Sequence, residues 1–251
     1  MNFLPHLFPF LCLLYLNLAP FETNKAVFEL TILHELTHIY QYTANIAAIR
    51  FSKAHEEISH SSYFITEMGK LEVLTPNLIF RNLRIVIRQL FEEFWCEGLA
   101  YLFQYAGNEK ELLKIAEKPE ESLSDMYYMG TKEAKQFLDI WNIIFKALGK
   151  QDSSTLSDMT DMIKDLRRRS ASIGLSMAFT ILYESKTPKE MTDMSPFQFI
   201  NAYEVSALKL KLKPLVTLTS GTGLIDYNRM LAQLTALYKQ YEKAGKLDIQ
   251  L

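Results

Sequence analysis

Apolar positions recur along this chain with helical spacing, and two stretches stand out. From about Lys25 to Arg50 they follow the pattern of a buried helix, for which Thr23 or Asn24 can supply the N-cap. A second stretch, residues 83–105, is more apolar still, and Gly107 follows it as a stop signal. The first half of the chain therefore predicts two buried helices.

The residues ahead of the first helix allow three interpretations. Residues 3–20 are apolar but are interrupted by prolines. A signal peptide requires Lys or Arg near its start, and none occurs before Lys25. The segment is also short for a membrane span. We favour a β-strand over about Phe10 to Leu18. Because this strand would lie so near the start of the chain, either its sheet is minimal or the N-terminus is truncated. We accordingly expect a cytoplasmic protein, with secretion or membrane anchoring as the alternative raised by residues 3–18.

Polar breaks divide the residues that follow Gly107. We interpret Pro119 to Ser122 as a loop and Thr131 to Leu148 as a helix that Gly149 ends. Gln151 to Ser154 is the best candidate for a linker.

Further helices are expected near residues 157–169 and 171–184, with a loop that begins at Lys186–Pro188. Ser195 and Pro196 have the residue types of an N-cap and a first helical position. Gly221 to Gly223 break the chain before a last helix from about Asp226 to Lys243.

Composition bounds the size and the partners of the protein. The chain has 251 residues, 49% of them hydrophobic, so it forms one large domain or a domain with a helical extension. Its 27 basic and 29 acidic residues nearly balance, which gives no indication of nucleic acid as a partner. Two cysteines, Cys12 and Cys96, do not make a disulfide framework.

Within the first helix, His34, Glu35 and His38 form an H-E-x-x-H motif. Residues four apart on a helix project from the same face, so both imidazoles can reach one metal ion. Glu35 then lies beside the open position where a water binds. This arrangement is typical of a zinc hydrolase with a glutamate as general base.

A catalytic zinc usually takes a third protein ligand, and the second helix offers two carboxylates. Glu97 is flanked by large apolar residues, and a carboxylate buried among them needs a partner such as a metal. Gly98 beside it would let a neighbouring helix approach closely. Glu93, one turn earlier, is the alternative ligand, or a residue that positions a ligand or contacts substrate. Both glutamates could also be ordinary surface charges, and Cys96 is expected to pack as a small apolar side chain.

The sequence His-Glu-Leu-Thr-His at residues 34–38, followed by Glu-Gly-Leu-Ala at 97–100, resembles the gluzincin group of zinc metallopeptidases, and more loosely some uncharacterised predicted zinc-dependent proteases. The resemblance covers about residues 10–106. It implies His34, His38 and Glu97 as ligands of one Zn²⁺ per chain and Glu35 as general base. The chain lacks the G-A-M-E-N motif of the aminopeptidases, and Tyr101 stands where thermolysin-type enzymes have an aspartate that supports a ligand.

The resemblance also implies a mechanism. Glu35 would accept a proton from a zinc-bound water and pass it to the leaving amine. The developing oxyanion needs a second donor, commonly a tyrosine or histidine. Tyr127, Tyr128 and Tyr183 are candidates, although each could equally be a packing residue.

We therefore expect a mainly α-helical (α+β) protein with a zincin-like core, a minimal N-terminal sheet and a helical C-terminal half. Residues 1–150 would hold the catalytic core, and residues 151–251 a subdomain that closes the cleft. The expected activity is zinc-dependent hydrolysis of peptide or protein substrates, with membrane association not favoured. The alternative is a non-catalytic binding or structural protein in which zinc only joins two helices. Glu35 favours the enzyme, because a purely structural site has no use for it.

Overall fold

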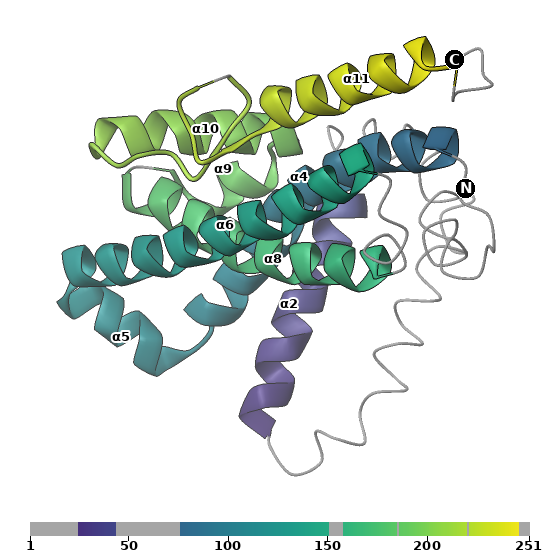
Figure 1. The fold of residues 1–251 in the computed structure, drawn as a ribbon. Coiled ribbons are helices and arrows are strands. Elements are labelled where there is room, and N and C mark those ends of the chain that lie inside the picture. Colours follow the sequence, from purple (N-terminus) through teal and green to yellow (C-terminus); the bar gives the residue numbers. More distant parts are fainter. Residues whose placement is uncertain (1–24, 44–75, 151–157, 185, 220, 246–251) are drawn as a thin grey trace.

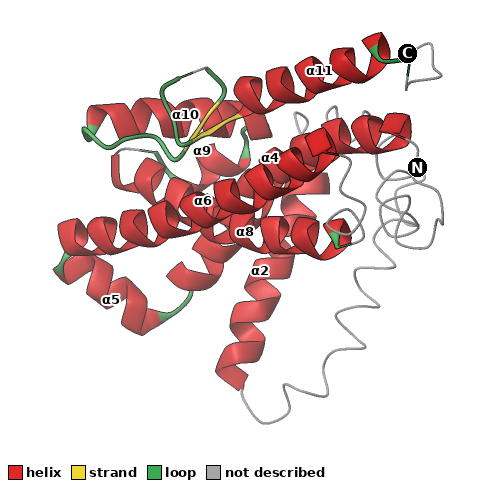
Figure 2. Ribbon diagram, viewed as in Figure 1, coloured by secondary structure: helices red, strands yellow, loops and turns green. Residues whose placement is uncertain are grey.

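Helices dominate the computed structural model, which describes residues 25–43, 76–150, 158–184, 186–219 and 221–245 (Figures 1 and 2). In chain order the elements are α2 (Lys25–Thr43), α4 (Pro76–Ala106), α5 (Glu109–Glu117), α6 (Pro119–Lys150), α8 (Met159–Glu184), α9 (Pro188–Thr192), α10 (Pro196–Lys209), β1 (Val216–Thr217), β2 (Ile225–Asp226) and α11 (Tyr227–Lys243). The mainly α-helical class expected from the sequence is confirmed for these residues.

Helix α4 is the central element. It packs against α2, α8, α10 and α11, and α8 packs in turn against α6. In Figure 1, α10 and α11 lie above this centre and α2 lies below it. A helix with apolar residues around its whole circumference must be buried, and α4 buries Leu90, Phe91, Phe94 and Leu99 completely. One hydrophobic core extends from α4 to α11.

Two glycines allow α4 and α8 to touch through their backbones. A Cβ on Gly98 would lie 2.4 Å from the carbonyl carbon of Gly174, and a Cβ on Gly174 would lie 2.1 Å from the carbonyl oxygen of Phe94. Neither position can hold a side chain at this separation. The close approach expected beside Glu97 is therefore present, and α8 is the helix that makes it.

The two helices predicted in the first half of the chain are confirmed over the described residues. Helix α2 begins at Lys25 and is described as far as Thr43, so the expected extension to Arg50 lies outside the described residues. Helix α4 contains all of residues 83–105 and starts earlier, at Pro76, a residue suited to the first turn of a helix. Gly107 ends it as predicted. The expected strand at 10–18 and the linker at 151–154 also lie outside the described residues.

Several predicted breaks between helices are wrong. Some of the residues concerned begin a helix, and others lie inside one. Pro119 is the first residue of α6, with acidic residues in the first turn, so residues 119–122 are helical and the helix expected at 131–148 is only its later part. Gly149 lies inside α6 and does not end it. Ser170 does not divide α8, because its hydroxyl donates to the carbonyl oxygen of Leu166 and the helix continues.

Capping residues define the shorter helices. Thr187 and Glu190 form a capping box with Pro188 at the first helical position, so the expected loop at residues 186–188 instead opens α9. The prediction for α10 is confirmed, since Ser195 caps it in the same way. That for α11 is confirmed too, because Asp226 accepts a hydrogen bond from the backbone N–H of Arg229 at its start.

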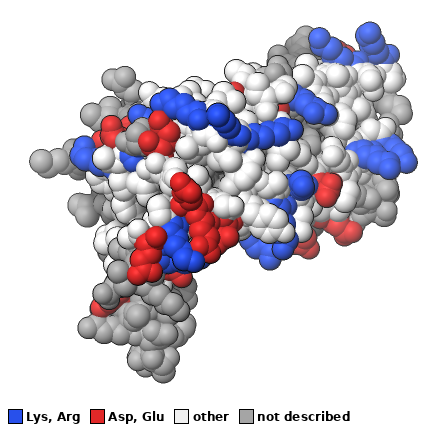
Figure 3. All heavy atoms as spheres, turned by 90° about the vertical axis from the view of Figure 1, so that its left-hand side faces the viewer, with Lys and Arg blue, Asp and Glu red and all other residues white. Residues whose placement is uncertain are grey.

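The sheet in the described part of the chain is small and lies near the C-terminal end. Strands β1 and β2 pair in parallel, with Val216 opposite Ile225. It is therefore not the predicted N-terminal sheet, whose residues are not described. Among the helices described, none is both long and apolar enough to cross a lipid bilayer. On the face in Figure 3, acidic and basic side chains lie side by side in some places, and elsewhere Lys and Arg side chains stand among uncharged residues.

The α4–α8 contact predicts a contrast between two alanine substitutions. Gly98→Ala should lower the free energy of unfolding by about 1–3 kcal/mol, as overpacking does, because the new methyl group meets backbone that cannot move aside. Gly149→Ala is the control, since its Cβ would meet only Leu237, at 3.9 Å. That variant should keep or raise stability. Urea denaturation measures both, and equal effects would contradict the proposed importance of the contact.

Candidate metal centre

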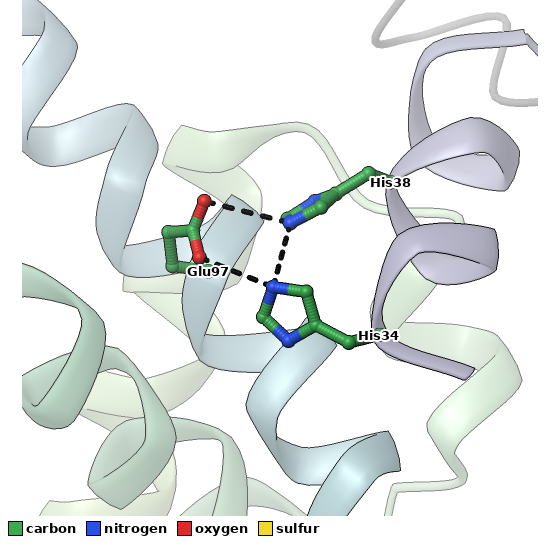
Figure 4. Close-up of side chains that lie close together, drawn as sticks. All are labelled: His34, His38 and Glu97. Carbon is green, nitrogen blue, oxygen red and sulfur yellow. Dashed lines mark hydrogen bonds and ion pairs between the residues drawn. The ribbon is translucent and has the colours of Figure 1, made fainter. Parts of the chain in front are cut away.

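His34 and His38 lie one turn apart on α2 and point at Glu97 of α4 (Figure 4). The Nε2 atoms of the two imidazoles are 3.1 Å apart. Glu97 Oε2 is 3.5 Å from Nε2 of His34, and Oε1 is 3.4 Å from Nε2 of His38. The structure thus brings together the two motif histidines and the carboxylate that the sequence singled out.

These distances fit a shared metal ion. Ligand bonds of about 2.0–2.2 Å in tetrahedral geometry place the ligand atoms about 3.4 Å from one another. The separations observed here are close to this value, although Glu97 faces each imidazole with a different carboxylate oxygen. Taken with one ligand atom per residue, the three atoms lie within 4.8 Å of one another. Two imidazoles and a carboxylate are also a donor set of catalytic zinc sites. A search of the described residues for three or more histidine, cysteine or acidic side chains that could hold one metal ion finds His34, His38 and Glu97. The residues present therefore fit zinc.

Gln41 orients His38, and sequence analysis did not identify it. Nδ1 of His38 donates to Oε1 of Gln41 over 3.2 Å, while the Gln41 amide donates to the carbonyl oxygen of Trp95 over 3.4 Å. A proton held on Nδ1 leaves the lone pair of Nε2 free to bind a metal. Gln41 follows His38 by three residues on the same helix face, a spacing that could have signalled this role.

Cys96 was expected to pack as a small apolar side chain, and it is buried. It also lies close to the site, because its Sγ is 3.2 Å from Nδ1 of His38. The sulfur therefore lies on the side of the imidazole that faces away from Glu97, together with Gln41.

Tyr101 packs against the other imidazole. Its ring meets that of His34 edge to face, with centroids 4.6 Å apart, and about 40% of the residue remains exposed. Nδ1 of His34 is buried and has no hydrogen-bond partner among the described residues. Tyr101 thus supports the orientation of His34 through ring packing, as far as the described contacts show.

Burial and charge act in opposite directions within the cluster. Burial on its own would raise the pKa of Glu97, but the two imidazoles and Arg167 outweigh it and lower that pKa. Burial lowers the pKa of His38, and Glu97 only partly opposes this effect. Both shifts favour the protonation states that bind a metal, a charged carboxylate and a neutral imidazole.

Glu93, the alternative third ligand, is engaged elsewhere. It accepts two hydrogen bonds from the guanidinium of Arg167 on α8, one of them from Nε over 2.8 Å. Burial raises the pKa of Glu93 although Arg167 opposes the shift. The structure therefore places Glu97, and not Glu93, with the two histidines.

Glu35 follows His34 on α2 and is partly exposed. Burial is the main cause that raises the pKa of Tyr101, and the charge of Glu35 adds to it and acts in the same direction on His38, so its carboxylate lies within electrostatic range of both residues. The expected neighbour of the metal ligands is thus in their vicinity.

The three tyrosines suggested as oxyanion donors are not brought to the cluster by the contacts described. Tyr127 donates its hydroxyl to the carbonyl oxygen of Lys213 over 2.9 Å, and Tyr128 is 73% exposed. Gly174 is the residue of α8 that touches α4 next to Glu97. Tyr183 lies nine residues further along α8, a distance of about 13 Å. Tyr101 is the tyrosine that the described contacts place against a histidine of the cluster.

A cavity of about 510 Å³ adjoins the cluster. Glu97 and Tyr101 form part of its wall on α4, and α8 forms the opposite wall. Helix α8 belongs to the half of the chain expected to close the cleft, and here it packs directly on α4.

Comparisons of the chain with models of protein families, with curated proteins and with solved structures found no match.

Zinc binding should depend on Glu97 and not on Glu93. The wild-type protein is expected to bind about one Zn²⁺ with a rise in melting temperature. Glu97→Gln should weaken binding by more than the roughly 10- to 100-fold typical of losing a residue that only supports a ligand. Glu93→Gln is the matched control and should retain wild-type affinity. Isothermal titration calorimetry measures both, and the reverse order would move the third ligand to Glu93.

Acid should destabilise the metal-free protein through His38. Because the pKa of folded His38 lies below its usual 6.5, the unfolded chain takes up this proton first. The free energy of unfolding should then fall as the pH drops from 6.5 through the folded pKa. Glu97, whose pKa is also lowered, adds a further loss below its usual 4.5.

Urea denaturation between about pH 5 and 8 measures this slope, and the window follows from the usual pKa of histidine. In His38→Gln the part of the slope that arises above pH 5 should be smaller than in the wild type. An unchanged slope would show that the protonation of His38 does not govern acid stability.

Proposed function

We propose that this protein is a zinc-dependent hydrolase of peptide bonds, with a site of the gluzincin type in a zincin-like core. The observation that carries the proposal is the convergence of His34, His38 and Glu97, whose ligand atoms all lie within 4.8 Å of one another. The general base that such a site needs, Glu35, lies next to His34 on the same helix.

Each residue then has a defined task. A zinc ion held by the two imidazoles and the carboxylate would act as a Lewis acid and lower the pKa of a bound water toward 7. The Glu35 carboxylate takes up the proton of the attacking water and later delivers it to the leaving amine. The Gln41 carbonyl holds the proton of His38 on Nδ1.

Tyr101 is the residue that best fits the donor to the developing oxyanion. Its ring lies against His34 and it lines the cavity next to Glu97. Burial, together with Glu97 and Glu35, raises the pKa of its hydroxyl. The phenol therefore keeps its proton at neutral pH and can donate it in a hydrogen bond.

The second candidate is a protein in which zinc joins α2 to α4 without turnover. The buried contacts between these helices would favour it equally, but the placement of Glu35 would then have no purpose. Peptide or protein substrates are the partners that follow from the favoured proposal.

Replacing the general base separates the two candidates. Glu35→Gln should keep stoichiometric zinc and wild-type stability while peptide hydrolysis falls by about 10²–10⁴-fold, the usual contribution of a general base. Glu29→Gln, an exposed glutamate earlier in α2, is the matched control and should retain full activity. A fluorogenic peptide library measures turnover, and zinc analysis checks loading. A zinc-loaded wild-type protein that hydrolyses no peptide would favour the structural candidate.

A further inference from the structure

The cavity beside Glu97 has two chemically different ends. One wall of it is α8, which contributes three cations, Lys164, Arg167 and Arg168, near its beginning. The later part of the same wall is uncharged. It consists of Ala171, Ser172 and Leu175, with Met129 of α6 beside them.

Helical spacing explains why these residues share one surface. Positions 164, 167 and 168, 171 and 172, and 175 recur every three to four residues, so they form one stripe along α8. The stripe faces Glu93, Glu97 and Tyr101, which follow one another at four-residue intervals on α4. Residues at the beginning of both stripes meet in the ion pair of Arg167 with Glu93.

One of these cations, Arg167, lies close enough to the proposed metal site to meet a substrate held there. Arg167 binds Glu93, one helical turn or about 6 Å along α4 from Glu97. An extended peptide advances about 3.3 Å per residue, so this separation corresponds to one or two residues of substrate.

The partners that these cations have within α8 are easily exchanged. Lys164 pairs with Asp161 over 2.9 Å and Arg168 with Asp165 over 2.6 Å. The side chains of the two cations are 71% and 76% exposed. Ion pairs this exposed contribute little to stability, so an incoming carboxylate can replace Asp161 or Asp165 at small cost.

The two acidic side chains that line the cavity, Glu93 and Glu97, already have partners, so they do not reverse its preference for an anion. Glu97 points its oxygens at the imidazoles, where a metal would neutralise them. Glu93 is already bound to Arg167 and occupies that guanidinium with a single carboxylate oxygen. The lining of the cavity thus holds three cations and two carboxylates, while Asp161 and Asp165 pair with Lys164 and Arg168 from outside it.

We propose that this cavity binds a carboxylate of the substrate peptide, one or two residues from the bond that is cleaved, through Lys164, Arg167 and Arg168. The carboxylate can be an acidic side chain or the terminal carboxylate of the peptide. This assignment rests on the proposed peptidase function, but the binding preference can be measured without turnover.

The test uses zinc-loaded Glu35→Gln protein and fluorescently labelled peptides, with fluorescence anisotropy as the readout. One pair of peptides differs only in a C-terminal acid or amide, and a second pair, both amidated, differs in Glu or Gln at an internal position. At least one of the two carboxylate peptides should bind about tenfold more tightly than its neutral partner, as expected for charge-assisted hydrogen bonds. This preference should shrink as ionic strength rises from about 0.05 to 0.5 M. The pair that shows it identifies the source of the carboxylate.

Variants then assign the preference to the cavity. In the Glu35→Gln background, Lys164→Gln combined with Arg168→Gln should reduce the tenfold preference to about twofold and leave the affinity for the neutral peptide unchanged, because rim charges act mainly on charged ligands. Arg229→Gln, an exposed arginine on α11 outside the cavity, is the matched control and should keep the full preference. Arg167 is left in place, because its removal would leave the partly buried Glu93 without this partner.

The outcomes separate this inference from the proposed function. Equal affinity for charged and neutral peptides, no binding of either, or a preference that survives the double variant would overturn the carboxylate site. A preference that disappears in the double variant, with no hydrolysis of any peptide by the wild-type protein, would uphold the binding site and overturn the peptidase.

Discussion

Contact between the backbones of α4 and α8 sets the position of everything in the candidate site that comes from α4. Gly98 and Gly174 leave no space between the two helices, and Glu97 is the residue immediately before this crossing. A carboxylate anchored beside such a contact has little freedom to drift, because the backbone that carries it is fixed on one side by α8 and on the other by α2. Preorganisation of this kind is what a metal or catalytic site requires of its scaffold.

The balance of electrostatic effects in the cluster follows from this rigid placement. Burying Glu97 among apolar side chains opposes its charge, and the two imidazoles and Arg167 outweigh that opposition. For His38 the balance is reversed, because burial dominates over the attraction of Glu97. The same surroundings thus keep one group charged and the other neutral, which is a division of protonation states typical of functional sites.

Sequence alone predicted the parts of the site that local spacing determines. The i, i+4 relation of His34 and His38 and the cost of burying Glu97 among apolar residues indicated these three residues, with Glu93 left open as the alternative third ligand. Long-range contacts were not accessible in the same way. That Glu93 would bind Arg167, 74 residues away in the sequence, depends on how α4 and α8 cross. Predicted loops failed at Pro119 and Pro188 for a different reason, since proline both breaks a helix and begins one, and only the residues after it distinguish the two cases.

The cluster also joins distant parts of the chain, because α2 and α4 contribute ligands about 60 residues apart in the sequence. A metal ion shared by the two helices would make its own binding and the docking of α2 a single linked equilibrium. At a free metal concentration 100 times the dissociation constant, this linkage adds about 2.7 kcal/mol to the stability of the folded state. The supply of metal in the cell would then govern how long the protein survives as well as whether its site is complete.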